Sequence, residues 1–129
     1  GKFIEVMATR LGADLNEMYE LAAKGQPLAI SAMCTVFAES EVISHIGSGE
    51  KREDIAAGVI HSVANRVANL AARFGVEENI VLTGGLCESP YFIQTLSDKL
   101  EHKVETDVFA RYAGALGAAL TAAKRRDLV

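Results

Sequence analysis

The sequence predicts an α/β domain that is mostly helical and contains one short parallel β-α-β unit. Apolar residues recur at helical spacing along most of the chain. Two short apolar runs, 79–82 and 103–108, lie on either side of one helical stretch. That order favours a parallel pair of strands joined by a right-handed crossover. With 129 residues, half of them apolar, the chain is expected to form a single domain over 1–129.

Composition excludes several classes of function. The formal net charge is −4 and the basic residues are scattered apart from 124–126, so a nucleic acid is not an expected partner. No apolar run approaches the roughly 18 residues of a membrane span, and no export signal opens the chain, so we expect a cytoplasmic protein without membrane contact. Cys34 and Cys87 are too few and too far apart for a disulfide framework or a self-contained zinc site.

The first elements are helices. The chain enters helical spacing at once and without an initiator methionine, which indicates a fragment of a longer polypeptide. A first helix is expected over 3–11. Asp14 begins a capping box and predicts a second helix that continues toward Gly25. Pro27 prevents its continuation, so residues 28–30 form an extended link.

That link delivers Cys34 to the start of a third helix, expected over 34–46. The free N–H groups and the positive dipole at a helix start stabilise a thiolate, either as an anion or as a ligand. The alternative is that Cys34 is a small buried apolar residue, as single intracellular cysteines commonly are.

A carboxylate interrupts the apolar stripe of this third helix. Val36, Ile43 and Ile46 fall on one helical face, and Glu39 falls on the same face. Glu39 is therefore either bonded in a partly buried site or simply flanks the stripe.

The longest helix is expected over 52–74, with its apolar face directed to the core and Gly75 closing it. Its opposite flank carries His61, Asn65 and Asn69, spaced four residues apart. Such a polar row is either a solvated face or the lining of a ligand cleft.

A buried strand over 79–82 then enters a tight loop at Thr83, Gly84 and Gly85. Glycines at the carboxyl end of a strand allow a nucleotide to approach the backbone, but a plain strand-to-helix turn has the same composition. Cys87 lies in this loop, where we expect a packing role rather than a ligand role.

The last predicted elements complete the β-α-β unit and add a final helix. Ser89 followed by Pro90 is a helix start, and the helix continues to Leu100. A second strand is expected over 103–108. The final helix, over 112–120, is rich in small residues and is expected to approach another backbone closely.

Three stretches together resemble a known family. They are Cys-Thr-Val-Phe-Ala-Glu-Ser-Glu at 34–41, Leu-Thr-Gly-Gly at 82–85, and the small-residue segment at 112–119. They resemble the ATPases that activate 2-hydroxyacyl-CoA dehydratases and the ATPase subunits of benzoyl-CoA reductase. The resemblance covers essentially the whole chain and implies the carboxy-terminal half of an ATPase fold of the acetate and sugar kinase, Hsc70 and actin type.

The resemblance also implies a metal cluster and partners. Members form homodimers or pseudo-symmetric heterodimers with one [4Fe-4S] cluster on the two-fold axis, and Cys34 matches one of the two cysteines that each subunit contributes. The family places its other cysteine in a loop ahead of the segment that begins at Gly1, so two copies of this chain alone do not supply four ligands. The implied partner is a CoA-thioester reductase or dehydratase component.

The nucleotide residues follow from the same resemblance, which implies ATP or ADP with Mg. Candidate nucleotide-binding residues are Thr83, Gly84 and Gly85, in the position of the family's adenosine motif, and Gly114, in its second connecting motif. The acidic phosphate-binding hairpins precede residue 1 in the family, so no catalytic residue is assigned. Intact, such a protein couples ATP hydrolysis to low-potential electron transfer. The alternatives are a cluster-free small-molecule kinase of the same superfold and a non-catalytic helical dimerisation module.

Overall fold

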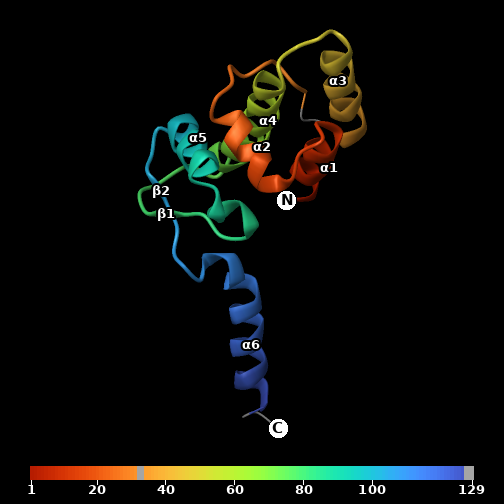
Figure 1. Cartoon of the computed structure of the whole chain (residues 1–129). Coiled ribbons are helices and arrows are strands. Elements are labelled where there is room, and N and C mark those ends of the chain that lie inside the picture. The colour runs from red at the N-terminus through yellow and green to blue at the C-terminus, as the bar shows by residue number, and fades with distance from the viewer. Residues whose placement is uncertain (32–33, 127–129) are drawn as a thin grey trace.

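The structure, a computed structural model, describes residues 1–31 and 34–126. Six α-helices and two short strands follow one another in this part of the chain, with two 3₁₀ turns (Figure 1). In order they are α1 (Lys2–Arg10), α2 (Leu15–Ala22), α3 (Thr35–Gly47), α4 (Arg52–Ala72), β1 (Ile80–Val81), η1 (Gly85–Glu88), α5 (Pro90–Leu100), β2 (Val104–Glu105), η2 (Ala110–Tyr112) and α6 (Ala113–Arg126). The predicted fold class and the order of elements are confirmed.

Two helix starts are fixed by the caps that the sequence predicts. The Asp14 carboxylate accepts a hydrogen bond of 2.9 Å from the Glu17 backbone N–H at the start of α2. The Ser89 hydroxyl accepts one of 3.2 Å from the Phe92 N–H at the start of α5, and Pro90 occupies the first helical position. Each cap satisfies a backbone donor that the helix itself leaves unpaired.

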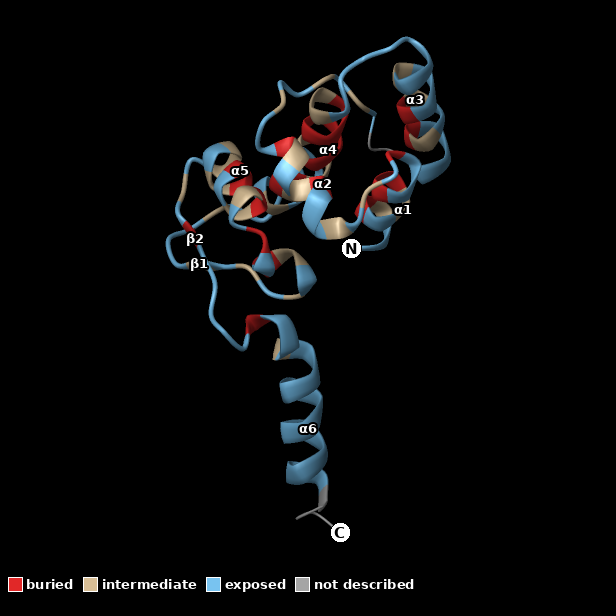
Figure 2. Ribbon diagram, viewed as in Figure 1, coloured by how far each residue is buried: buried red, intermediate tan, exposed pale blue. Residues whose placement is uncertain are grey.

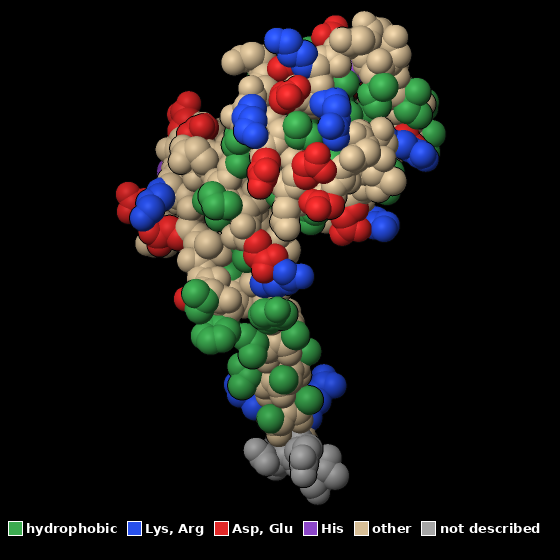
Figure 3. Space-filling model, viewed as in Figure 1, with side chains coloured by type: hydrophobic (Ala, Val, Ile, Leu, Met, Phe, Trp, Pro, Cys, Tyr) green, Lys and Arg blue, Asp and Glu red, His purple; other side chains and the backbone are tan. Residues whose placement is uncertain are grey.

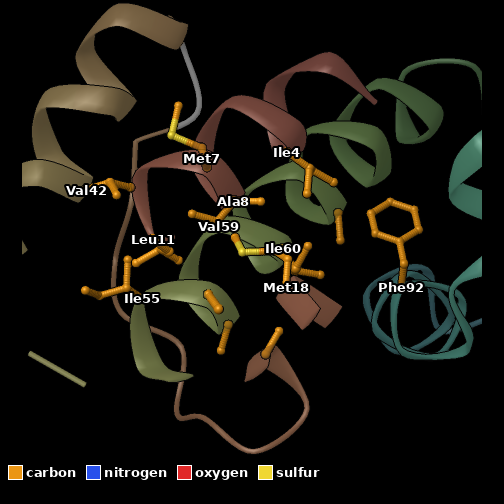
Figure 4. Packing of buried hydrophobic residues seen from close by; sticks show 14 of the residues in the cluster. Ile4, Met7, Ala8, Leu11, Met18, Val42, Ile55, Val59, Ile60 and Phe92 are labelled. Atoms are coloured by element: carbon orange, nitrogen blue, oxygen red, sulfur yellow. The ribbon is translucent and has the colours of Figure 1, made fainter. Parts of the chain in front are cut away.

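Helix α4 is the centre of the body. It packs against α2 on one side and α5 on another, with α1 and α3 also in contact. Its buried residues are red in Figure 2, and the close-up in Figure 4 shows Ile55, Val59 and Ile60 facing side chains of α1, α2 and α5. The predicted apolar face of this helix is therefore confirmed for its first half. Its end differs, because Leu70 and Phe74 are exposed.

A glycine makes one of these contacts possible. Gly58 lies in the middle of α4, and a Cβ added there would stand 2.5 Å from the Leu28 carbonyl oxygen. The extended link therefore runs directly over the α4 backbone, and the Leu28 N–H donates to the Asp54 carbonyl at 3.3 Å. This contact fixes the segment that leads toward Cys34.

The sheet is parallel, as predicted, but shorter than predicted. β1 and β2 pair in the register Ile80 with Val104 and Val81 with Glu105. Beyond the paired residues, the Leu82 N–H still donates to the Glu105 carbonyl at 2.8 Å. Helix α5 connects the two strands and contacts β2. The loop that begins at residue 83 therefore lies inside the β-α-β unit, directly after β1.

The apolar stripe of the third helix is not the face that packs on the body. Val36, Ile43 and Ile46 are 67%, 52% and 42% exposed, whereas Ala38 and Val42 are fully buried. α3 therefore packs on α1 and α4 through a different, narrower face. The large apolar side chains point away from the body.

Helix α6 also departs from the prediction. It projects from the body in Figure 1 and, within the described part of the chain, contacts only η2. Cβ atoms added at Gly114 and Gly117 would meet nothing within 4 Å. The close packing expected of this small-residue helix is thus absent here. None of the described helices is both long and apolar enough to cross a membrane.

Candidate functional site

The glycine loop lies directly after β1. Gly84 has φ 85°, a left-handed backbone conformation that side chains rarely adopt, and its N–H donates to the Ala110 carbonyl at 3.0 Å. A Cβ added at Gly84 or Gly85 would meet nothing within 4 Å. Thr83 is exposed beside them. The loop therefore presents open backbone at the carboxyl end of a strand.

The beginning of α6 lies close to this loop. Ala110, whose carbonyl accepts the Gly84 N–H, belongs to η2, and η2 leads directly into α6 and Gly114. An ion pair between Arg111 and Glu88 joins the same two segments. The structure thus brings the turns that carry the predicted nucleotide residues together, although those residues are far apart in sequence.

This region also exposes apolar side chains. Hydrophobic side chains gather along α6 and around its start in the space-filling view (Figure 3). The exposed ones are Val108, Phe109, Tyr112, Leu116 and Leu120. An exposed patch of this kind is typical of a surface that another group covers.

Cys34 is the N-cap residue of α3. Its backbone is extended, with φ −140° and ψ 133°, and its carbonyl accepts the Ala38 N–H at 3.0 Å. The predicted position at a helix start is confirmed. The thiol is free and exposed, so the alternative of a small buried cysteine is wrong. Ala32 and Met33, which precede it in the chain, lie outside the described residues.

The described residues of one chain do not form a metal site by themselves. Among residues 1–31 and 34–126, no group of three or more His, Cys, Asp or Glu side chains is placed to hold a metal ion. Cys87 is also free but is only 6% exposed, inside η1, which agrees with the packing role expected of it. One chain therefore offers one accessible thiol among its described residues.

The two carboxylates that follow Cys34 have defined partners. Glu39 accepts a hydrogen bond from Arg10 Nε at 2.5 Å, and its side chain is 25% exposed. Of the two alternatives for Glu39, the bonded, partly buried site is the one observed. Glu41 accepts the Ser31 N–H at 2.6 Å. The sequence carried no signal for either partner, because Arg10 lies 29 residues from Glu39 and Ser31 donates from its backbone.

The polar row on α4 borders two adjoining open clefts, and Asn65 and Asn69 are also exposed to solvent. Asn65 and Asn69 border one of about 470 Å³, and His61 and Asn65 border another of about 820 Å³ that extends to the link before Cys34. His61 Nε2 lies 3.3 Å from the Tyr91 hydroxyl. Partial burial, assisted by the charge of Lys99, lowers the pKa of His61. This shift favours the neutral form of the imidazole.

Comparisons with known proteins give a consistent result. The family model for the BadF/BadG/BcrA/BcrD ATPases matches residues 1–122. The chain is 44% identical to the (R)-2-hydroxyglutaryl-CoA dehydratase activating ATPase of Acidaminococcus fermentans, over 97% of this chain and 48% of that protein. It is 34% identical to a benzoyl-CoA reductase subunit of Thauera aromatica, over 98% of this chain and 48% of that protein.

A solved structure agrees. The activator of the 2-hydroxyisocaproyl-CoA dehydratase from Clostridium difficile, with bound ADPNP, matches with a TM-score of 0.85 and 37% identity. The match covers all of this chain and 50% of that one. The chain thus spans about half the length of the relatives it matches. With a family model matched over residues 1–122 and this structural agreement, the chain belongs to the BadF/BadG/BcrA/BcrD ATPase family.

Proposed function

We propose that this chain is part of an ATP-dependent activator that donates low-potential electrons from a [4Fe-4S] cluster to a 2-hydroxyacyl-CoA dehydratase or a benzoyl-CoA reductase. The observation that carries the proposal is the family match over residues 1–122. Relatives named as dehydratase activators and as a reductase subunit support it. The same names do not favour the cluster-free kinase or the helical dimerisation module.

The nucleotide would bind beside the glycine loop. Thr83, Gly84, Gly85 and Gly114 are the proposed contacts for ATP or ADP with Mg. The open space over Gly85 supports this assignment, because a nucleotide can reach the backbone where no Cβ intervenes. The ADPNP bound to the related activator supports the class of ligand. No residue of this chain is assigned to hydrolysis.

Cys34 would supply one ligand to the cluster. Its exposure and its place at the start of a 13-residue helix suit a thiolate ligand to an anionic cluster, because the helix dipole stabilises negative charge there. A four-cysteine cluster shared by two subunits needs two thiolates from each. We therefore propose a homodimer or pseudo-symmetric heterodimer, acting in the cytoplasm, whose remaining ligands come from outside these 129 residues.

Nucleotide binding is tested with one substitution and its matched control. Gly85→Leu places a side chain over the proposed site, whereas Gly47→Leu adds the same side chain at another glycine with open space around it. Calorimetric titration with ADPNP and Mg²⁺ should show at least a roughly tenfold loss of affinity for Gly85→Leu, a loss of about 1.4 kcal/mol. Equal affinity in both variants would remove the glycine loop from the site.

The cluster is tested in the protein with its full natural sequence, purified anaerobically. We expect iron and sulfide at about one four-iron cluster per dimer. Cys34→Ala should abolish the cluster and leave ADPNP binding intact, whereas Cys87→Ala, at the buried thiol, should retain it. A cluster retained by Cys34→Ala would overturn the ligand assignment.

A further inference from the structure

Two carboxylates of α3 hold the chain on both sides of Cys34. Three residues before it, the Ser31 N–H donates to Glu41 Oε2 at 2.6 Å. Five residues after it, Glu39 Oε1 accepts from Arg10 Nε of α1 at 2.5 Å. The first bond ties the incoming segment to α3, and the second ties α3 to the body. Cys34 lies between them.

These bonds matter because little else holds α3 in place. Among its described side chains, Ala38 and Val42 are the buried ones, and both are small or of medium size. Val36 and Ile43 are mostly exposed and add little to packing against the described residues. Hydrogen bonds to a charged acceptor are shorter and stronger than neutral ones. The two carboxylates therefore add two charged hydrogen bonds to the limited packing of α3 on α1 and α4.

We infer that Glu39 and Glu41 are positioning residues for Cys34: together they set the place and direction of the helix start that carries the thiol. Arg10 contributes to the same positioning, because it donates the hydrogen bond to Glu39. The reason for holding Cys34 in place rests on the proposed function, since a cysteine that bridges two subunits through a cluster has to keep a fixed position. The geometry itself is tested without iron or nucleotide.

The test measures where Cys34 lies. Nitroxide labels are attached to Cys34 and to Glu20→Cys, an exposed position of α2, in a Cys87→Ala background. Pulsed electron–electron resonance then gives the distribution of distances between the two labels. Glu39→Ala and Glu41→Ala should broaden or shift that distribution. Ser44→Ala, at an exposed position of α3, and Glu50→Ala, which removes a nearby charge, should leave it unchanged.

Hydrogen exchange gives the size of the effect. Exchange of α3 amides should rise about tenfold in Glu41→Ala, which loses a hydrogen bond to a charged acceptor. It should rise about threefold in Glu39→Ala, whose partner Arg10 is half exposed, so that solvent screens the pair. Protection of α4 should remain as in the parent chain, because its core contacts are untouched.

Exchanging the two charged residues of the ion pair distinguishes a positioning role from a general loss of folding. Arg10→Glu combined with Glu39→Arg should restore the parent distance distribution, whereas either single change should disturb it. Where an alanine variant fails to fold, the glutamine variants replace it. An unchanged distribution in both Glu39 and Glu41 variants would overturn the inference. Because no cluster is present in this experiment, failure of the cluster assignment would leave its result intact.

Discussion

Gly58→Ala tests the packing of the link that leads to Cys34. In an exposed helix interior this change stabilises by about 1 kcal/mol, because alanine is the better helix former. At Gly58 the new Cβ would stand 2.5 Å from the Leu28 carbonyl oxygen and 3.0 Å from Ile30 Cδ1. Helix propensity therefore predicts that Gly58→Ala stabilises the protein, whereas the close packing predicts that it destabilises it.

The magnitude follows from how far the link has to move. Ordinary contact begins at 3.4 Å, so the Leu28 carbonyl has to retreat by about 0.9 Å. Movement of Leu28 is restricted, because its N–H donates a hydrogen bond to the Asp54 carbonyl. Overpacking of this kind costs about 1–3 kcal/mol, and subtracting the gain in propensity of about 1 kcal/mol leaves a net destabilisation of about 0–2 kcal/mol. For a chain of 129 residues each kcal/mol lowers Tm by about 4 °C, so the expected fall in Tm is at most about 8 °C.

The assay is thermal and urea unfolding followed by circular dichroism at 222 nm. Gly47→Ala is the control, since it adds the same methyl group to a helix where nothing lies within 4 Å. Its Tm should stay level or rise. If Gly58→Ala also raised Tm, the link would not lie against α4, and Cys34 would not be positioned by that contact.

The remaining predictions concern single side chains. Iodoacetamide should modify Cys34 at least about tenfold faster than Cys87, because only the former thiol is exposed; mass spectrometry of the modified peptides measures this, and equal rates would contradict it. Ser89→Ala should lower the free energy of unfolding by about 1 kcal/mol through loss of the α5 cap, measured by urea titration, whereas Ser44→Ala at an exposed site should change it little. Burial lowers the pKa of His61, so below the unfolded value of about 6.5 the unfolded chain binds more protons and stability falls. His61→Gln should remove this part of the acid sensitivity, as seen by urea titrations at several pH values; an unchanged pH dependence would refute it.

Local signals in the sequence were sufficient to predict the order of the elements and the starts of two helices. Asp14 and the Ser89-Pro90 pair act through neighbours within one helical turn, so their caps could be predicted without knowledge of the fold. The same holds for the glycine loop after β1, whose position follows from the strand before it. Chemistry confined to a few consecutive residues is readable from the chain alone.

Contacts between distant segments were not predictable in this way. The periodicity of the third helix identified its large apolar residues, but Val36 and Ile43 are exposed because α1 and α4 meet the side that carries Ala38. A hydrophobic pattern shows which face is apolar and not which face has a partner. The bond between Arg10 and Glu39 has no sequence signal either, since both residues also suit an exposed helix surface.

The isolation of α6 has a thermodynamic consequence. A 14-residue helix that contacts only η2 gains little from tertiary packing in the described chain, and helices of this length are marginal alone in water. Its helix–coil equilibrium is therefore uncoupled from the cooperative unfolding of the body. Since unfolding enthalpy scales at about 0.7 kcal/mol per residue, calorimetry should report a transition sized for the body without α6. Any group that covers the exposed face of α6 would raise that enthalpy by drawing the helix into the cooperative unit.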